Sequence, residues 1–282
     1  SGVAQQPMPR QAEASPAQSR PMPSAPSPDG APAGAAAGPE HPLDPAIQMA
    51  REGLVHIRQN VRDYTCTLVK RERVNGQLND YEYMFTKVRN RKLVDGRVAV
   101  PFSVYMYFLK PTNIKGREVV YVEGANNGKM MAHEGGAAGA WLPSIWLRPD
   151  GPLAMRGNLY PITDVGVENL VLKLIERGER EKQYGECQVT FHKNAKVNGR
   201  VCTLLQVMHP EQREHFEFYL AQVFIDDEYN VPIRYAAYSW PSEPGGRPEV
   251  IEEYTYLNLK LNVGLTDADF DHTNPDYRFT SK

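Results

Sequence analysis

The sequence predicts an α+β fold that is mainly β, in which helices cover an antiparallel sheet. Between residues 64 and 133, and again between 187 and 261, stretches rich in Val, Thr, Tyr and Phe alternate in the way typical of strands. Turn pairs such as Asn75-Gly76 and Asn127-Gly128 join neighbouring stretches and indicate hairpins. Two segments, near 45–61 and 163–177, carry apolar residues at helical spacing. Strands linked by hairpins, with two helices beside them, predict an antiparallel meander.

The first 43 of the 282 residues differ in composition from the rest. They are almost entirely Pro, Ala, Ser, Gly and Gln, so they cannot bury enough apolar surface to offset the entropy of ordering. We therefore expect a disordered linker at 1–43, a single domain at 44–273 with a helical and loop insert at about 135–180, and a tail at 274–282. A formal net charge of -2, without a basic stripe, argues against nucleic acid. No apolar run reaches the roughly 18 residues of a membrane helix.

The first helix is predicted to begin at Asp44-Pro45, an N-cap residue followed by proline at the first helical position. A hairpin with a two-residue loop at Asn75-Gly76 should follow. The register of this hairpin places six paired side chains on one face. On the opposite face it places the cross-strand pair Arg71–Asp80. That first face holds Tyr64, Cys66, Leu68, Tyr81, Tyr83 and Phe85.

The stretch Phe102–Gly124 predicts a strand, a tight connection and a second strand. Its first arm is apolar or aromatic on both faces. Phe102, Val104, Met106 and Phe108 lie on one face, and Ser103, Tyr105, Tyr107 and Leu109 on the other. A strand beside water should be apolar on one side only. Both faces must therefore be covered, by the protein's own helices, by a ligand or by a partner.

A long segment, Gly135–Ile162, contains Trp141 and Trp146 together with several prolines and glycines. Long connections inside a domain are usually functional lids or packed covers. The second helix is expected to follow, capped by Thr163 or Asp164 and ending at Gly178. The segment is then either a second hydrophobic cluster under a loop or a lid over an open, curved sheet.

The last third of the sequence predicts five more strands and the register of the first hairpin among them. A loop at Val197–Gly199, with Gly199 in a left-handed conformation, places Val189 and Phe191 opposite Val207 and Leu205. The strands are expected at Cys187–Lys193, Arg200–His209, Glu214–Ile225, Val231–Trp240 and Val250–Leu261.

No catalytic or metal-binding pattern is complete in the sequence. His133-Glu134 lacks the second histidine of a zinc-protease helix. Asp267, Asp269 and Asp271 have calcium-loop spacing, but His272 stands where that loop needs glycine. Cys66 falls on an apolar strand face, where a thiol is unreactive. We therefore expect no catalytic residue, no metal and no cofactor. The disulfide state of Cys66, Cys187 and Cys202 stays open.

The order of elements resembles the LolA/LolB lipoprotein-carrier superfamily, an unclosed β-barrel with a helical lid. The passages that carry the likeness are FLKPTNIKGREVVYVEG, FIDDEYNVPIRY and YLNLKLNVGLTDADF. YTCTLVKRERVNGQL and GPLAMRGNLYPITDVG are similar to an uncharacterised bacterial domain family of the same predicted fold. The resemblance covers about 45–272. It implies a LolA-like half-barrel and a hydrophobic cavity for acyl chains in the periplasm, although no acyl-gripping arginine can be matched.

These observations favour a non-enzymatic extracytoplasmic carrier, in the periplasm or cell envelope with its export signal removed, that holds a lipid-like ligand or the acyl chains of a lipidated protein. Peripheral contact with the envelope is compatible with this hypothesis. One alternative is an envelope interaction or scaffold module that meets another chain through Tyr105 and Tyr107. The other is a hydrolase using Lys110, Glu118 and His133. The expected cavity residues are Leu68, Tyr83, Phe85, Phe102, Met106, Phe108, Trp141, Trp146, Leu170 and Leu174.

Overall fold

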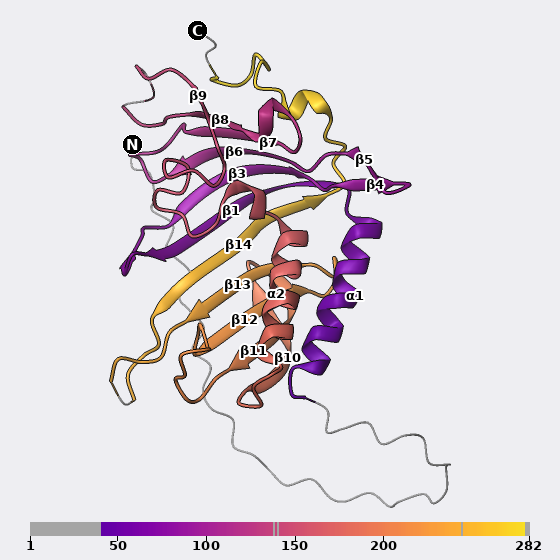
Figure 1. Ribbon diagram of the computed structural model, residues 1–282, viewed down its shortest axis with the longest axis vertical. Helices are drawn as coiled ribbons and strands as arrows, with labels where there is room; N and C mark the ends of the chain where they lie inside the picture. The colour runs from indigo at the N-terminus through magenta and orange to yellow at the C-terminus, as the bar shows by residue number, and fades with distance from the viewer. Residues whose placement is uncertain (1–40, 138, 140, 244, 280–282) are drawn as a thin grey trace, which may run out of the picture. The chain divides into compact units, whose positions relative to one another are not determined.

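The computed structural model describes residues 41–137, 139, 141–243 and 245–279. Nearly all of the predicted linker, residues 1–43, lies outside the described residues. The sheet runs in the order β10-β11-β12-β13-β14-β1-β3-β6-β7-β8-β9, all of its strand pairs being antiparallel. The short strand β2 pairs with β1, and β4 with β5. Two helices, α1 and α2, pack against each other beside the sheet (Figure 1).

The elements have the following bounds. The helices are α1 (Asp44–Asn60) and α2 (Val167–Glu181). The first group of strands is β1 (Asp63–Val74), β2 (Gln77–Leu78), β3 (Glu82–Arg89), β4 (Lys92–Val94), β5 (Arg97–Val100), β6 (Ser103–Lys110), β7 (Glu118–Val122), β8 (Met130–His133) and β9 (Ile145–Leu147). The second group is β10 (Gln188–Val197), β11 (Arg200–Met208), β12 (Leu220–Asp226), β13 (Pro232–Tyr238) and β14 (Val250–Leu261).

The sheet is made of two successive meanders joined in the middle. The last strand, β14, lies against the first, β1, over eight paired positions from Tyr64–Leu261 to Glu72–Glu252. The two outermost strands, β9 and β10, have no pairing with each other among the described residues. The sheet is therefore curved but unclosed, which confirms the predicted fold class.

The first hairpin confirms the turn and corrects the register beyond it. Val74 pairs with Gln77, as a two-residue Asn75-Gly76 loop requires. One extra residue before β3 then shifts the pairing, so that Leu68 lies opposite Met84. Since a one-residue slip exchanges the two faces of a strand, Met84 points into the core while Tyr83 and Phe85 point away from it. The predicted Arg71–Asp80 pair is replaced by a hydrogen bond from Arg71 to the Asn79 carbonyl (3.0 Å).

Strand β6 is covered on both faces, as its two-sided apolar pattern predicts. Phe102, Val104, Met106 and Phe108 belong to the main core. On the opposite face, Tyr105 packs with Phe270 and Phe279, and its ring stacks on Tyr277 with centroids 4.1 Å apart. The second cover is therefore the C-terminal segment. The residues expected to form a tail from 274 onward include Tyr277 and Phe279 of this cover.

The two helices differ from prediction at their ends. The carboxylate of Asp44 accepts a hydrogen bond from the backbone N–H of His41 (2.8 Å), and Asp44 is itself the first residue of α1. Helix α2 starts after Gly166, later than the predicted caps, and continues past Gly178 to Glu181. A Cβ at Gly178 would lie 2.9 Å from Cγ1 of Ile47, so this glycine permits the close approach of α1 rather than ending the helix.

In the second half, the predicted pairs Val189–Val207 and Phe191–Leu205 are confirmed. The turn itself has two residues, since Val197 pairs with Arg200, and Gly199 has the expected left-handed φ of 84°. An irregularity between His192 and Ala195 absorbs the difference.

Candidate functional site

A cavity of about 630 Å³ lies between the inner face of the sheet, the insert and α2. Its floor comes from strands β1, β3, β6, β7, β8, β13 and β14, and its cover from the segment Leu142–Gly166 and from α2. The cover is fastened to the floor where α2 begins. The backbone N–H of Val167 donates to the buried hydroxyl of Tyr64 (3.0 Å), and a Cβ at Gly166 would lie 3.0 Å from the same oxygen. Glycine at 166 is therefore required for this contact.

One part of the cavity wall is apolar. Met84, Met106, Phe108, Val119 and Met130 form it from neighbouring strands, because each is the inward member of the alternating pattern of its strand. Methionine is flexible and polarisable, so such a wall can adapt to an irregular apolar ligand. The insert adds further apolar residues from above: Leu142, Pro143, Ile145, Leu147, Pro149, Leu153, Ala154 and Ile162.

The other part of the wall carries a buried pair of carboxylates. Glu72 and Glu252 stand directly opposite each other on β1 and β14, and each residue is only 3% exposed. Like charges at such positions repel, and burial penalises both. The hydroxyl of Tyr254 lies between them, 2.6 Å from Glu72 and 3.2 Å from Glu252. Burial raises the pKa of Glu252, with the nearby Glu72 raising it further against the opposing effect of Arg177.

Two cations adjoin this pair. The Nζ of Lys70 lies 3.2 Å from Glu72 and 3.3 Å from Glu82, and it also donates to the side-chain oxygen of Asn158. Arg177 of α2 donates to the Tyr235 hydroxyl (2.7 Å) and contacts Glu217 (2.8 Å).

Two phenol groups complete this end of the cavity. The hydroxyls of Tyr160 and Tyr235 lie 3.2 and 3.3 Å from Oε1 of Glu252. Burial raises the pKa of Tyr235 well above its usual value, so its hydroxyl keeps its proton. This polar cluster was not predicted from the sequence. Its one sequence signal is that Lys70 and Glu72 continue the inward face begun by Tyr64, Cys66 and Leu68.

Five of the ten expected cavity residues lie on the wall: Leu68, Met106, Phe108, Leu170 and Leu174. The other five do not. Tyr83 and Phe85 face away because of the register shift, and Phe102 packs in the core against Tyr121 (ring centroids 6.4 Å apart). Trp146 is the outward residue of β9 and contacts the ring of His272 (centroids 5.0 Å apart). Trp141 is 87% exposed.

The residues of the two alternative hypotheses are arranged differently from what those hypotheses require. Tyr105 is buried under the C-terminal segment and is not available to another chain. Glu118 accepts a hydrogen bond from the backbone N–H of Arg278 (3.0 Å). Lys110 lies over the ring of Tyr83, and His133 Nδ1 lies 3.1 Å from the Ser144 hydroxyl. Glu118 and His133 stand opposite each other on β7 and β8, but Glu118 accepts from the Arg278 backbone and His133 contacts Ser144.

The acidic repeat near the C-terminus fastens that segment to the sheet. Asp267 pairs with Arg89 and Asp269 with Lys87, both at 2.7 Å, while Asp271 accepts the N–H of Thr273. In the described part of the chain, no group of three His, Cys, Asp or Glu side chains could hold a metal ion. Cys66, Cys187 and Cys202 are all free thiols. No helix of the described residues combines the length and hydrophobicity that crossing a membrane requires.

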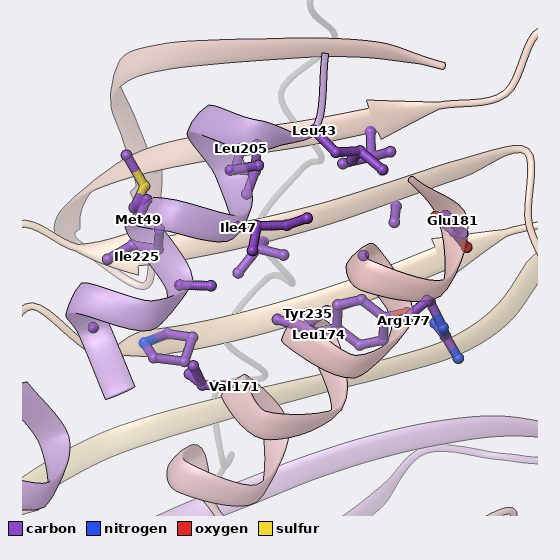
Figure 2. A pocket seen from close by; sticks show the side chains of 18 of the residues that line it. Leu43, Ile47, Met49, Val171, Leu174, Arg177, Glu181, Leu205, Ile225 and Tyr235 are labelled. Atoms are coloured by element: carbon purple, nitrogen blue, oxygen red, sulfur yellow. Dashed lines mark hydrogen bonds between the residues drawn. The ribbon is translucent and has the colours of Figure 1, made fainter. Parts of the chain in front are cut away.

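A second, smaller pocket of about 90 Å³ lies between α1, α2 and strands β11 to β13 (Figure 2). Ile47, Leu205 and Ile225 point into it from these elements (Figure 2). Leu174, Arg177 and Tyr235 belong to the walls of both cavities. The hydrogen-bonded pair Arg177–Tyr235 therefore forms part of the partition between them.

The fold and the site define a class of protein: an open antiparallel sheet that shelters a cavity with one apolar and one polar wall under a helical cover. The chain belongs to the family described as "Protein of unknown function (DUF1571)", whose pattern matches residues 61–279. This confirms the prediction of an uncharacterised family. No curated protein matches the sequence.

Several solved structures are similar over most of the chain. The lipoprotein LppX of Mycobacterium tuberculosis is 11% identical with a TM-score of 0.42, covering 81% of this chain and 100% of that one. MucB, solved in complex with MucA(peri), is 15% identical with a TM-score of 0.41, covering 80% and 59%. A LolA superfamily protein of Nitrosomonas europaea is 9% identical with a TM-score of 0.31, covering 79% and 97%. At this level of similarity, neither ligand nor partner transfers to the chain.

Proposed function

We propose that the chain is a non-enzymatic, extracytoplasmic binding or carrier protein that holds a lipid-like ligand in the cavity beneath the insert. The observation that carries this proposal is the cavity itself. Its volume of about 630 Å³ lies within the roughly 300–1,000 Å³ of small-molecule sites, which are mostly apolar with a few polar groups. Methionines and aromatic rings from several strands line one continuous part of it.

The driving force would be burial of an alkyl chain. Each methylene removed from water contributes about 0.8 kcal/mol, so a chain of about twelve carbons gains about 10 kcal/mol before the costs of association. Several cover residues, among them Leu142 and Leu153, line the cavity and are also half exposed. They provide an apolar edge along which such a chain could enter. An acyl chain of a lipoprotein is one candidate ligand, in the periplasm or cell envelope.

The alternative of an interaction module has less support. It depended on Tyr105 and Tyr107 meeting another chain and on a core filled by the protein's own side chains. Tyr105 is covered by the C-terminal segment, and the cavity is not filled by side chains.

The test is to fill the cavity from a site where a larger side chain can be accommodated. Ala132 lines the cavity from β8, and Ala132→Trp would project a ring into it. Binding of an environment-sensitive apolar dye and its displacement by dodecanol would be measured by fluorescence. We expect Ala132→Trp to weaken dye binding at least tenfold. The control, Phe85→Trp on the outward face of β3, should bind as the natural chain does. The proposal fails if the natural chain binds no dye, or if Ala132→Trp, folded to the same extent, binds it equally well.

A further inference from the structure

Part of the cavity's cover presents apolar side chains to solvent. Four exposed residues of the insert form this apolar rim: Trp141, Leu142, Ile145 and Leu153. Resting on the proposed function, we propose that the apolar rim docks on the surface of an anionic lipid bilayer, where the guanidinium of Arg156 binds a lipid phosphate. The lipid-like ligand would then pass between the bilayer and the cavity without crossing water.

The apolar rim lies where the cavity meets solvent. Leu142, Ile145 and Leu153 are between 41% and 52% exposed, and all three also line the cavity. Trp141, the residue before Leu142, lies outside the cavity wall and is 87% exposed. Single apolar side chains at a surface are ordinary, but a group of them beside one opening is typical of an interaction site. The apolar surface is therefore continuous from the exposed rim to the interior of the cavity.

Hydrogen bonds tie the backbone that carries the apolar rim to the sheet. Ile145 belongs to β9, which pairs with β8. Beyond Leu153, the side chain of Asn79 donates to the carbonyl of Gly157 (3.1 Å). The backbone N–H of Leu159 donates to the carboxylate of Glu72 (3.1 Å). The rim is thus held in place before it meets a partner, so little conformational entropy is lost on docking.

The charges beside the apolar rim suit an anionic surface. Acidic side chains of the insert and of the cavity wall next to it are paired with cations, in the pairs Arg117–Glu134 (2.8 Å), Arg148–Asp150 (3.0 Å) and Lys173–Asp164 (2.9 Å). Arg156 also lines the cavity, is exposed, and makes no ion pair within the described part of the chain. Its guanidinium therefore remains available to a phosphate, which it can bind with two parallel hydrogen bonds.

The types of residue on the apolar rim favour a bilayer over a protein partner. Tryptophan combines an apolar ring with one N–H donor and is enriched at the level of lipid headgroups. Leucine and isoleucine beside it can enter the acyl boundary, while a nearby cation remains among the phosphates. A bilayer also holds the lipid-like ligand that the proposed function requires. The exposed rim and the lining of the cavity would thus form one apolar path for that ligand.

The experiment measures flotation of the full chain with vesicles of phosphatidylcholine alone and of phosphatidylcholine with phosphatidylglycerol in equal parts. We expect the natural chain to bind the mixed vesicles severalfold more tightly. Trp141→Ser should weaken this binding at least tenfold, whereas Trp141→Phe, which keeps an aromatic ring, should nearly preserve it. Arg156→Gln should weaken it about fivefold, the effect of one basic residue near an anionic surface. The control is Val55→Ser on α1, a similarly exposed apolar position outside the rim, which should bind as the natural chain does.

The outcomes separate this inference from the function on which it rests. Because Trp141 lies outside the cavity wall, Trp141→Ser should bind the apolar dye as the natural chain does. If the natural chain binds the dye but no vesicle, the inference is overturned, a protein becomes the partner of the rim, and the carrier function stands. That result needs no variant, so it remains decisive if a substitution prevents folding. Equal vesicle binding by Trp141→Ser and Val55→Ser would also overturn the inference. If the dye does not bind, the proposed function itself is wrong.

Discussion

Replacing Glu181 with glutamine should stabilise the protein at pH 8 and change its stability little at pH 5. Glu181 is the last residue of α2, is 4% exposed, and has Oε2 3.5 Å from Nε2 of the fully buried His209. The Nδ1 atom of His209 lies 3.1 Å from the Phe218 carbonyl, which can only accept. The imidazole therefore donates from Nδ1, and Nε2 of its neutral form is an acceptor that faces the Glu181 carboxyl.

The pKa of Glu181 is raised by this environment from 4.5 to about 7, chiefly through burial, with Arg177 and Arg180 opposing the shift and Glu217 adding to it. Burial also lowers the pKa of His209, which favours the neutral imidazole. At 1.36 kcal/mol per pKa unit, the shift of Glu181 corresponds to at most about 3 kcal/mol. The folded state holds the proton over a range in which the unfolded state has lost it. The stabilisation of the folded state by the protonated Glu181 carboxyl is therefore complete below about pH 4.5, and it is lost as the pH rises through about 7.

Urea unfolding of the natural chain and of Glu181→Gln between pH 5 and pH 8 would measure the effect. The difference in free energy of unfolding should grow from near zero to about 3 kcal/mol in favour of the variant, because glutamine can donate to His209 without ionising. Glu179→Gln, at an exposed position on the same helix paired with Arg51, serves as the control and should show a nearly constant difference. A difference for Glu181→Gln that is the same at pH 5 and pH 8 would refute the reasoning.

Three further predictions concern packing and reactivity. Phe270→Ala empties the cluster around Tyr105 and should lower the free energy of unfolding in urea by about 3–5 kcal/mol. Phe191→Ala, at a partly exposed site, should lower it far less. Equal losses for the two variants would contradict the role of the C-terminal cover. Gly135→Ala would place a Cβ 2.2 Å from the Ile114 carbonyl oxygen, so the melting temperature of this variant should be several degrees lower than that of the natural chain. The control is Gly185→Ala, where no atom lies within 4 Å of the added Cβ and the melting temperature should stay unchanged. Because burial raises the pKa of the Cys66 thiol, a thiol reagent should label Cys66 only after unfolding, and rapid labelling of the native chain at this residue would disprove that.

Local patterns predicted the strands well because alternation and turn chemistry depend on residues close together in the chain. The two covered faces of β6 followed directly from its sequence. The face of β3 did not, because the Asn75-Gly76 turn determines only the first pairs. A single extra residue before Glu82 then exchanged the faces of Tyr83 and Met84. Inserting one residue leaves the composition of the hairpin almost unchanged, so the sequence offers little warning of it.

The C-terminal cover shows a second limit of the same kind. Residues 274–282 were expected to form a tail, since few apolar side chains lie there. However, Phe270, Tyr277 and Phe279 are spaced so that all three reach the outer face of β6 and β7, while Asp267 and Asp269 pair with Arg89 and Lys87. These contacts join elements far apart in the chain, so they cannot be inferred from composition.

The same limit explains why the polar end of the cavity could not be predicted. Taken alone, Lys70 and Glu72 look like solvent-facing charges at the end of a strand, and Glu252 looks like part of an acidic pair. Tyr254 and Glu72 are separated by 182 residues, and only the pairing of β1 with β14 brings them together. Burying two opposed carboxylates opposes folding unless other groups compensate. Lys70, Arg177 and three phenols supply that compensation, and they do so on the wall of a cavity large enough for a ligand. A network that served only to join strands would not need to face such a cavity.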